Sequence, residues 1–264
     1  MKAILRYPGA KWNLANWIVH QLPSHKTYLE PYFGSGAVFF NKKSSPVETI
    51  NDIDSRITNL FRILRQCPDE LAKTIEMTPW AREEYQSSEE PTDDQVEKAR
   101  RFIVRCWMAI GSNTDHKTGW KSAVSGTGRS SYAKDWSGVP ERIRLAAQRL
   151  KQAQIENMPA VELILRYRRD DVLIYADPPY VMSTRTQVNY ANEMGELDHR
   201  ELLETLDNHP GPVLISGYAC ELYDNRLTDW TRKTTKAIAE GGKEREEVLW
   251  LNAEATKRLG MTLF

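Results

Sequence analysis

The tetrapeptide Asp177-Pro178-Pro179-Tyr180 combines residue types that could hold an amine group for chemistry. Two successive prolines fix the backbone and supply no N–H, so the carbonyl oxygens of Asp177 and Pro178 should be held outward. A carboxylate and a rigid carbonyl are two acceptors, as a planar NH2 group requires. Tyr180 adds an aromatic face that can stack on the ring bearing that amine. The alternative is a proline turn with a capping aspartate, which leaves this combination of groups unexplained.

The segment Glu30-Pro31-Tyr32-Phe33-Gly34-Ser35-Gly36 is a candidate nucleoside-binding loop. Its glycines fall between a predicted strand and an apolar helical run, where glycine lets backbone approach a ligand closely. Asp52 lies 18 residues beyond Gly34, just past the next predicted strand, where a carboxylate can accept hydrogen bonds from ribose hydroxyls. Because Phe39 stands where a dinucleotide fingerprint has its third glycine, an adenosine-type cofactor fits better than a dinucleotide.

Both motifs need a scaffold that places strand ends side by side, and the apolar pattern predicts one. Short strand-like runs alternate with helix-like segments, which indicates an α/β fold with a mostly parallel sheet. The predicted strands are Thr27–Glu30, Val47–Asn51, Val172–Ala176 and Val213–Ser216. The predicted helices are Trp12–Gln21, Ser55–Arg65, Ala160–Arg168 and His199–Leu206. Arg232–Ile238 and Glu246–Leu251 flank a glycine turn and predict an antiparallel hairpin at one sheet edge.

Composition limits the class of protein. The chain has 264 residues, 41% of them hydrophobic, which suffices for one main core and a small inserted lobe. Its 36 basic and 36 acidic residues balance, so any contact with a polyanion must rest on local charge. Cys67, Cys106 and Cys220 form no CxxC pair, which favours a reduced intracellular protein without a cysteine metal site. No apolar run is long enough for a signal peptide or a membrane span, so we expect a cytoplasmic protein.

About 120 residues separate the second and third predicted strands, too many for a single crossover helix, and predict an inserted lobe. Residues 69–97 carry 10 acidic and 2 basic side chains, whereas residues 98–151 carry 12 basic and 3 acidic ones. This cationic half also holds Trp107, Trp120, Tyr132 and Trp136, which suit base stacking beside phosphate contacts. In the alternative interpretation, the cations solvate a helical face and the tryptophans fill the core of the lobe.

With these motifs in this order, the chain resembles the Dam-type, or D12-class, adenine-specific DNA methyltransferases over nearly its full length. Tyr7-Pro8-Gly9-Ala10-Lys11 is similar to the aromatic-x-Gly-Gly-Lys segment of that family, with Tyr7 where tryptophan is common and Ala10 where a second glycine is common. Asn51-Asp52-Ile53-Asp54 resembles the ribose-binding turn, and Asp177 to Tyr180 the catalytic tetrapeptide. Val213 to Ser216 and Arg245-Glu246-Glu247-Val248-Leu249 also look like family segments.

The resemblance implies a Rossmann-like class I methyltransferase sheet with a C-terminal antiparallel hairpin and S-adenosylmethionine as cofactor. Residues 1–60 and 152–264 would form the catalytic domain, and residues 61–151 an inserted, mainly helical lobe that recognises the DNA target. Cofactor contacts would come from Tyr7, Lys11, Glu30, Phe33, Gly34, Ser35, Gly36, Asp52, Asn157 and Asp177. Asn157 is also an ordinary turn residue at a strand end.

The expected reaction is methylation of the N6 amine of adenine in double-stranded DNA. The lone pair of this amine is delocalised into the ring, so the Asp177 carboxylate and the Pro178 carbonyl would accept its two hydrogens and aim the nitrogen at the methyl group. Pro179 keeps the turn rigid, and no metal is required. The base must be flipped out of the duplex, with Tyr180 stacking on it and Tyr190 helping to hold it. His199 and His209 are expected on a helix surface and in a loop, without a catalytic role.

The DNA-binding candidates in the insert are polar, basic or aromatic: Asn113, Trp120, Lys121, Arg129 and Lys134. Two alternatives to DNA adenine methylation stay open from the residues alone. One is methylation of another exocyclic or amide nitrogen, such as cytosine N4, RNA adenine or a protein glutamine. The other is a catalytically silent nucleic-acid binding module. The DNA sequence read, a restriction-modification role with a cognate endonuclease, and the oligomeric state do not follow from the sequence.

Overall fold

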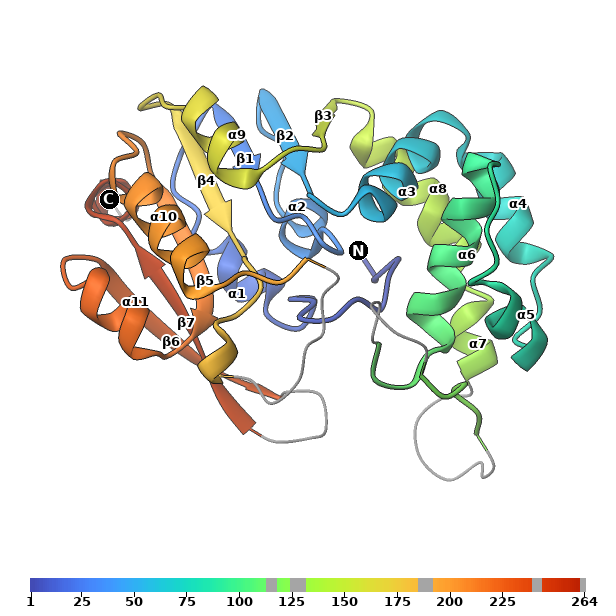
Figure 1. The fold of residues 1–264 in the computed structure, drawn as a ribbon. Coiled ribbons are helices and arrows are strands. Elements are labelled where there is room, and N and C mark those ends of the chain that lie inside the picture. Colours follow the sequence, from blue (N-terminus) through green and yellow to red (C-terminus); the bar gives the residue numbers. More distant parts are fainter. Residues whose placement is uncertain (113–117, 124–131, 185–191, 239–243, 262–264) are drawn as a thin grey trace. The chain divides into compact units, whose positions relative to one another are not determined.

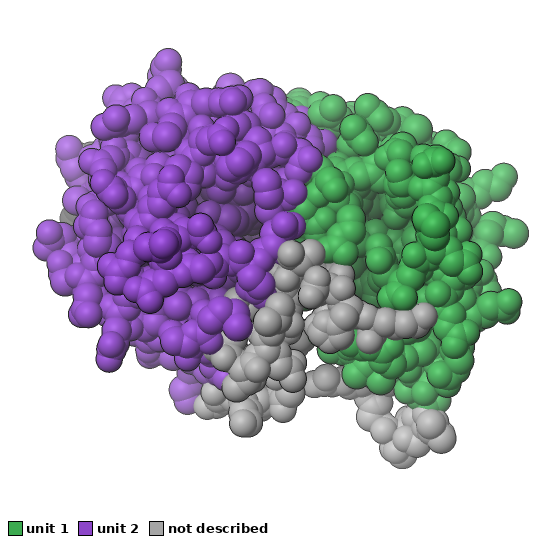
Figure 2. All heavy atoms as spheres, in the orientation of Figure 1, with its two compact units in different colours: residues 1–10, 54–152, 189–191 green, residues 11–53, 153–188, 192–264 purple. Residues whose placement is uncertain are grey.

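The structure is a computed structural model of residues 1–264. It describes the chain outside residues 113–117, 124–131, 185–191, 239–243 and 262–264. The chain forms two compact units, coloured in Figure 2. The sheet unit comprises residues 11–53, 153–188 and 192–264, and the helical unit comprises residues 1–10, 54–152 and 189–191.

The sheet unit is built on a seven-stranded sheet with the order β3-β2-β1-β4-β5-β7-β6 (Figure 1). Its strands are β1 (Thr27–Glu30), β2 (Val47–Asn51), β3 (Ala153–Glu156), β4 (Val172–Ala176), β5 (Val213–Tyr218), β6 (Thr231–Ile238) and β7 (Glu244–Leu251). The first five strands pair in parallel, and β7 pairs antiparallel with both β5 and β6. The predicted α/β class, the four predicted strands and the edge hairpin are therefore confirmed.

Helices cover the sheet and give it a core. They are α1 (Ala15–Val19), α2 (Ala37–Asn41), α9 (Ala160–Arg166), α10 (Glu196–Asp207), α11 (Glu221–Arg226) and α12 (Ala253–Met261), with the short 3-10 turn η2 (Met182–Thr184). Leu163, Leu202 and Tyr223 from α9, α10 and α11 pack with strand residues such as Ile174 and Ile215. Fully burying one such aliphatic side chain contributes about 1.5 to 3 kcal/mol. All five residues of β4 are buried, which anchors the strand that leads into Asp177.

Some predicted elements differ in the structure. The predicted strands do not include β3, because its sequence is only partly apolar and Gln154 is exposed. The helix predicted over Trp12–Gln21 shortens to α1, since Leu14 N–H donates to the Lys11 carbonyl in a turn before the helix begins. The prediction that His199 lies on a helix surface is wrong. His199 is fully buried on α10, and its Nδ1 lies 3.0 Å from the Tyr223 hydroxyl.

The helical unit contains α3 (Ser55–Gln66), α4 (Pro68–Glu76), α5 (Arg82–Ser87), α6 (Gln95–Met108), the 3-10 turn η1 (Ile110–Ser112), α7 (Tyr132–Trp136) and α8 (Val139–Leu150). It begins earlier than the expected boundary at residue 61, because α3 packs on α6 and α8 and is N-capped by Asp54. Residues 1–10 join it as well, since Trp107 Nε1 donates to the Ile4 carbonyl at 2.7 Å.

Two of the tryptophans considered for base stacking fill the core of the helical unit instead. Trp107 and Trp136 are 2% and 5% exposed, and their rings meet edge to face at 6.1 Å. Trp136 Nε1 donates to the Thr78 carbonyl at 2.7 Å. Because both indole N–H groups bond backbone inside the unit, these two rings serve packing.

The charge asymmetry of the insert is partly neutralised by ion pairs within the unit. Arg100 pairs with Glu84 at 2.7 Å and with Glu97 at 2.6 Å, and Arg101 pairs with the same Glu97 at 2.6 Å. Arg144 reaches Asp69 at 3.3 Å. The acidic first half of the insert thus supplies partners for the basic second half, so the cationic region expected from the charge count is partly cancelled by folding.

We predict opposite effects of alanine at two glycines of the sheet unit. A Cβ at the buried Gly211 would lie 2.3 Å from the Val172 carbonyl oxygen and 2.8 Å from that of Arg169, so Gly211→Ala should lower the free energy of unfolding by about 1 to 3 kcal/mol. Gly260, in α12, has nothing within 4 Å of that position, so Gly260→Ala should raise stability by about 0.5 to 1 kcal/mol. Urea unfolding of both variants checks this, and equal effects at the two sites would contradict it.

Candidate active site

The candidate site lies where the strand order reverses. β1 is hydrogen-bonded to β2 on one side and to β4 on the other, all parallel, so their carboxyl ends meet at one edge of the sheet. In open α/β sheets this reversal point is where ligands bind. The loop after β1 holds Gly34, the turn after β2 holds Asp52, and Asp177 directly follows β4. The fold thus brings together three motifs, of which the first and the last lie more than a hundred residues apart in the sequence.

The glycine loop after β1 is tied to the acidic turn. The Gly34 backbone N–H donates to Asp52 Oδ2 at 2.9 Å. Gly34 and Gly36 have φ values of 49° and 69°, a left-handed conformation that favours glycine. A Cβ on Gly36 would also lie 2.5 Å from Cζ of Phe33. The loop therefore needs glycine at this position both for its backbone conformation and for the packing of the Phe33 ring.

Two asparagines fasten the neighbouring strand ends. Asn51, 1% exposed at the end of β2, donates to the carbonyls of Pro31 and Met158 at 2.9 and 3.0 Å. Asn157, just after β3, donates to the backbone carbonyls of Asp52 and Ile53 at 2.7 and 3.2 Å. The sequence alone places Asn51 in the ribose-binding motif but assigns it no role. Its position at the end of a buried strand, where polar side chains need partners, is the signal that indicates one.

Asp177 is held by groups from two other segments. Ser216 Oγ, on β5, donates to Asp177 Oδ1 at 2.8 Å, because β5 runs beside β4 with Ala176 opposite Ile215. The Lys11 ammonium lies 2.9 Å from Oδ1 and 3.0 Å from Oδ2 of Asp177. The Lys11 side chain is only 6% exposed and that of Asp177 18%. A partly buried carboxylate with a cation and a hydroxyl on it keeps one orientation and a compensated charge.

Tyr180 is fixed by the edge hairpin as well as by the tetrapeptide. Its hydroxyl donates to Oε1 of Glu247 on β7, and its ring meets that of Tyr218 at 4.6 Å and 73°. The Lys11 ammonium lies 4.6 Å from the centre of the same ring. Burial, together with the negative charge of Asp177, raises the pKa of Tyr180 well above its usual value, so the phenol stays protonated and donates. Ser216 and Glu247 carry no role in the sequence-based prediction, because their positions depend on strand pairing.

Glu30, Phe33 and Ser35 have buried side chains with internal contacts. Glu30 is 2% exposed and accepts a 2.7 Å hydrogen bond from the Tyr28 hydroxyl. Burial raises the pKa of Glu30 to about 8, although the bond from Tyr28 opposes this shift. Ser35 Oγ accepts from Trp12 Nε1 at 3.1 Å. These side chains shape the glycine loop from inside, whereas Gly34 and Asp52 are partly exposed.

The remaining predicted site residues lie in the helical unit or outside the described chain. Tyr7 is 9% exposed and packs on Phe102, with ring centres 6.4 Å apart. Trp120 has Arg82 over its ring at 4.8 Å. Lys121 is partly buried, with Nζ 3.5 Å from the Trp107 carbonyl, whereas Lys134 on α7 is exposed. Asn113, Arg129 and Tyr190 lie outside the described residues.

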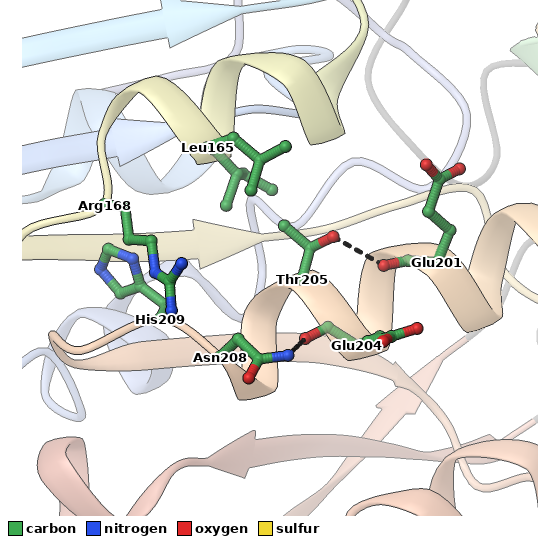
Figure 3. Close-up of a pocket in the computed structure, with 8 residues that line it drawn as sticks. Leu165, Arg168, Glu201, Glu204, Thr205, Asn208 and His209 are labelled. Carbon is green, nitrogen blue, oxygen red and sulfur yellow. Dashed lines mark hydrogen bonds between the residues drawn. The ribbon is translucent and has the colours of Figure 1, made fainter.

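Two open pockets in the described part of the sheet unit have linings that include no motif residue. One of about 330 Å³ lies between α9 and α10 and contains His209 near Arg168 (Figure 3). His209 is 5% exposed, and its Nε2 lies 3.0 Å from the Val172 carbonyl oxygen, so this loop histidine has a buried ring. The other, of about 840 Å³, is lined by residues of η2, α10 and α11 and by Val181, which follows Tyr180 in the sequence. None of the predicted site residues lines either pocket.

In the part of the chain that the structure describes, no three His, Cys, Asp or Glu side chains gather as a metal site. No helix there has both the length and the apolar character needed to cross a membrane.

Comparison with known proteins agrees with this arrangement of motifs. The DNA adenine methylase of Escherichia coli (strain K12) is 25% identical over 267 residues, with 94% of this chain and 92% of that relative covered. The DNA adenine methylase of Vibrio cholerae serotype O1 is 25% identical over 280 residues, with 98% and 97% covered. The Type II methyltransferase M1.LlaDCHI of Lactococcus lactis subsp. cremoris is 22% identical over 261 residues, with 92% and 90% covered.

A solved structure, precorrin 8w decarboxylase of Methanobacterium thermoautotrophicum, aligns with a TM-score of 0.41 and 8% identity, over 94% of this chain and 93% of that one. This likeness is too distant to inform function. The model of the D12 class N6 adenine-specific DNA methyltransferase family, by contrast, matches residues 7–244, which include the glycine loop, the Asp52 turn and the Asp177 tetrapeptide but only the first residue of β7. The chain therefore belongs to the D12 class N6 adenine-specific DNA methyltransferase family.

Proposed function

We propose that the sheet unit binds S-adenosylmethionine and transfers its methyl group to N6 of an adenine flipped out of duplex DNA at a specific site. The observation that carries this proposal is the Asp177 carboxylate. It follows β4 at the strand-order reversal and is fixed there by Lys11 and Ser216. A preorganised acceptor next to a nucleoside-type loop is what orientation of an exocyclic amine requires.

The residues present fit an adenosine-type methyl donor. Asp52 is partly exposed just after β2, and its ionised carboxylate is an acceptor that already takes one hydrogen bond from the Gly34 N–H. Ribose hydroxyls are matching donors. The left-handed glycines allow close approach of backbone to the ligand. When bound, S-adenosylmethionine would supply an electrophilic methyl group on its sulfonium, and Asn157 would act by holding the Asp52 turn in place.

In this proposal the chain contributes orientation and charge compensation. The Asp177 carboxylate and the Pro178 carbonyl accept the two amine hydrogens, and Pro179 keeps the carbonyl fixed. Ser216 donates to Oδ1 of this carboxylate and so helps to hold its orientation. Lys11 neutralises the carboxylate in a site where an uncompensated charge would be costly. Tyr180, tethered through its hydroxyl, offers its ring to the adenine.

We also propose that the helical unit recognises the DNA target. The exposed Lys134 on α7 is suited to a phosphate contact, whereas the partly buried Lys121 has its Nζ directed at the backbone of Trp107. Asn113, Arg129 and Tyr190 remain candidates for base or phosphate contact, outside the described residues. Against a catalytically silent module stands the presence of Lys11, Asp52 and Asp177, with Lys11 paired to Asp177 and Asp52 bonded to the glycine loop.

Replacing Asp177 should abolish methyl transfer without unfolding the protein. Asp177→Ala removes one of the two amine acceptors, and orientation effects of this kind are worth orders of magnitude in rate. The measurement is transfer of label from S-adenosylmethionine to duplex DNA. Asp170→Ala, at the exposed amino end of β4, is the matched control and should keep wild-type turnover. If Asp177→Ala retained more than about a tenth of the rate, its orienting role would be wrong.

Asp52→Ala should weaken cofactor binding by about 1.5 to 3 kcal/mol, the worth of charge-assisted hydrogen bonds to ribose hydroxyls. Calorimetric titration with S-adenosylmethionine measures this. Asp54→Ala is the comparison, since the Asp54 carboxylate N-caps α3 through the Arg56 N–H at 2.9 Å. That variant should lose about 1 kcal/mol of stability and bind the cofactor normally. Weaker binding in Asp54→Ala alone would assign the ribose contact to Asp54.

The two described lysines of the insert should respond differently to alanine. If Lys134 contacts a phosphate, Lys134→Ala should weaken binding of all duplexes alike and reduce the slope of log affinity against log salt by about 0.9. Lys121→Ala should mainly lower the melting temperature of the protein, because this side chain packs inside the unit. Fluorescence anisotropy across a salt series checks both. An unchanged salt slope in Lys134→Ala would show that Lys134 is an ordinary solvated surface residue that contacts no phosphate.

A further inference from the structure

Glu247 is a buried carboxylate in an unusual position, on a strand of the edge hairpin. It is 3% exposed and lies opposite Tyr218 in the pairing of β7 with β5. Burying a carboxylate costs free energy unless charge and hydrogen bonds compensate it. The compensating groups are those of the methyl-transfer site: the Tyr180 hydroxyl, which donates to Oε1, and the Lys11 ammonium, 3.8 Å from the same oxygen.

We propose that Glu247 is a positioning residue for methyl transfer, which aims the Tyr180 ring at the target base and holds Lys11 between two carboxylates. This inference deepens the proposed function and rests on it. Glu247 touches neither the amine nor the methyl donor in that scheme. It acts through Tyr180 and Lys11, both of which contact or adjoin Asp177.

The contacts of Tyr180 support the first part of the proposal. Tyr218 and the Lys11 ammonium contact its ring without hydrogen bonds, at 4.6 Å each. Such contacts hold a ring more loosely than a charge-assisted hydrogen bond at its far end. The bond to Glu247 therefore fixes the direction of the side chain. Without it, the ring could swing away from a stacked base while the tetrapeptide backbone stayed in place.

The charges around Lys11 support the second part. Its ammonium lies 2.9 Å from Asp177 Oδ1 and 3.8 Å from Glu247 Oε1, so one cation serves two carboxylates. Burial raises the pKa of Glu247, and the positive charge of Lys11 lowers it again. If the charge of Glu247 is removed, Asp177 no longer shares the Lys11 charge with a second carboxylate. A more tightly paired Asp177 is a poorer acceptor for an incoming amine.

The neighbouring Glu246 provides a matched control on the same strand. Consecutive residues of a strand point to opposite faces, and Glu246 pairs with Arg232 of β6 at 3.1 Å with its side chain 53% exposed. Glu246→Gln therefore changes the charge of β7 without touching the site. It should leave turnover, cofactor binding and the melting temperature near wild-type values.

The test uses Glu247→Gln, Glu247→Ala, Tyr180→Phe and the double variant Glu247→Ala with Tyr180→Phe in the full chain. Glu247→Ala should lower kcat for duplex DNA by about 10- to 100-fold, because a small displacement of a group that positions the substrate costs a factor of this size. The dissociation constant of S-adenosylmethionine should change little. Glu247→Gln should fall between wild type and Glu247→Ala, because its amide oxygen still accepts from Tyr180 but carries no charge for Lys11.

The double variant separates positioning from a purely structural role. If Glu247 acts through the Tyr180 hydroxyl, the two substitutions should not add, either in kcat or in the melting temperature of the ligand-free protein. Additive losses in kcat, or a kcat of Glu247→Ala within about twofold of wild type, would overturn the proposal. If the losses in melting temperature were non-additive but the losses in kcat were additive, the bond between Tyr180 and Glu247 would have only a structural role. Absence of methyl transfer in the wild-type protein would instead refute the proposed function, and the melting temperatures would still report the bond.

Discussion

The Lys11 ammonium is the contact on which the organisation of the site depends. It lies within 3.0 Å of both oxygens of Asp177 and 3.8 Å from Glu247, so it joins the segment before α1, the end of β4 and the edge strand β7. Removing one partner of a buried ion pair typically costs about 3 to 5 kcal/mol, because the other charge is left uncompensated. The segment that carries Lys11 is therefore held to the sheet by charge as well as by packing. This explains how a residue so far from the tetrapeptide in sequence becomes part of the same site.

Around that ionic centre, polar side chains fasten the loops that leave the strands. Asn51 joins the chain after β1 to the chain after β3, and Asp52 joins its own turn to the glycine loop. Each bond contributes only about 0.5 to 1.5 kcal/mol to stability. Their main effect is geometric, since they turn three loops into one rigid rim. A reaction that relies on orientation needs such a rim, because small displacements of an acceptor cost large factors in rate.

The sequence predicts those features that depend on local pattern. Apolar runs such as Val172–Ala176 predict the strands, and the tetrapeptide at the end of that run predicts the site. The roles of Ser216 and Glu247 could not be predicted in this way, because they arise from the register of β5 against β4 and β7. β3 is missed because its short sequence is too polar. The burial of His199 is missed because it depends on the packing of α10 against Tyr223 of α11.

The charge of the insert shows the same limit and bears on how DNA is bound. A count along the sequence gives an acidic half and a basic half, but Arg100, Arg101 and Arg144 pair with carboxylates of the acidic half. With a net charge of zero for the whole chain, long-range attraction to DNA is weak. Under the proposed function, affinity would then rest on short-range phosphate contacts by exposed cations, for which Lys134 is the described candidate. Base contacts and the energy of flipping the adenine would decide which DNA site is methylated, because phosphate contacts do not distinguish base sequences.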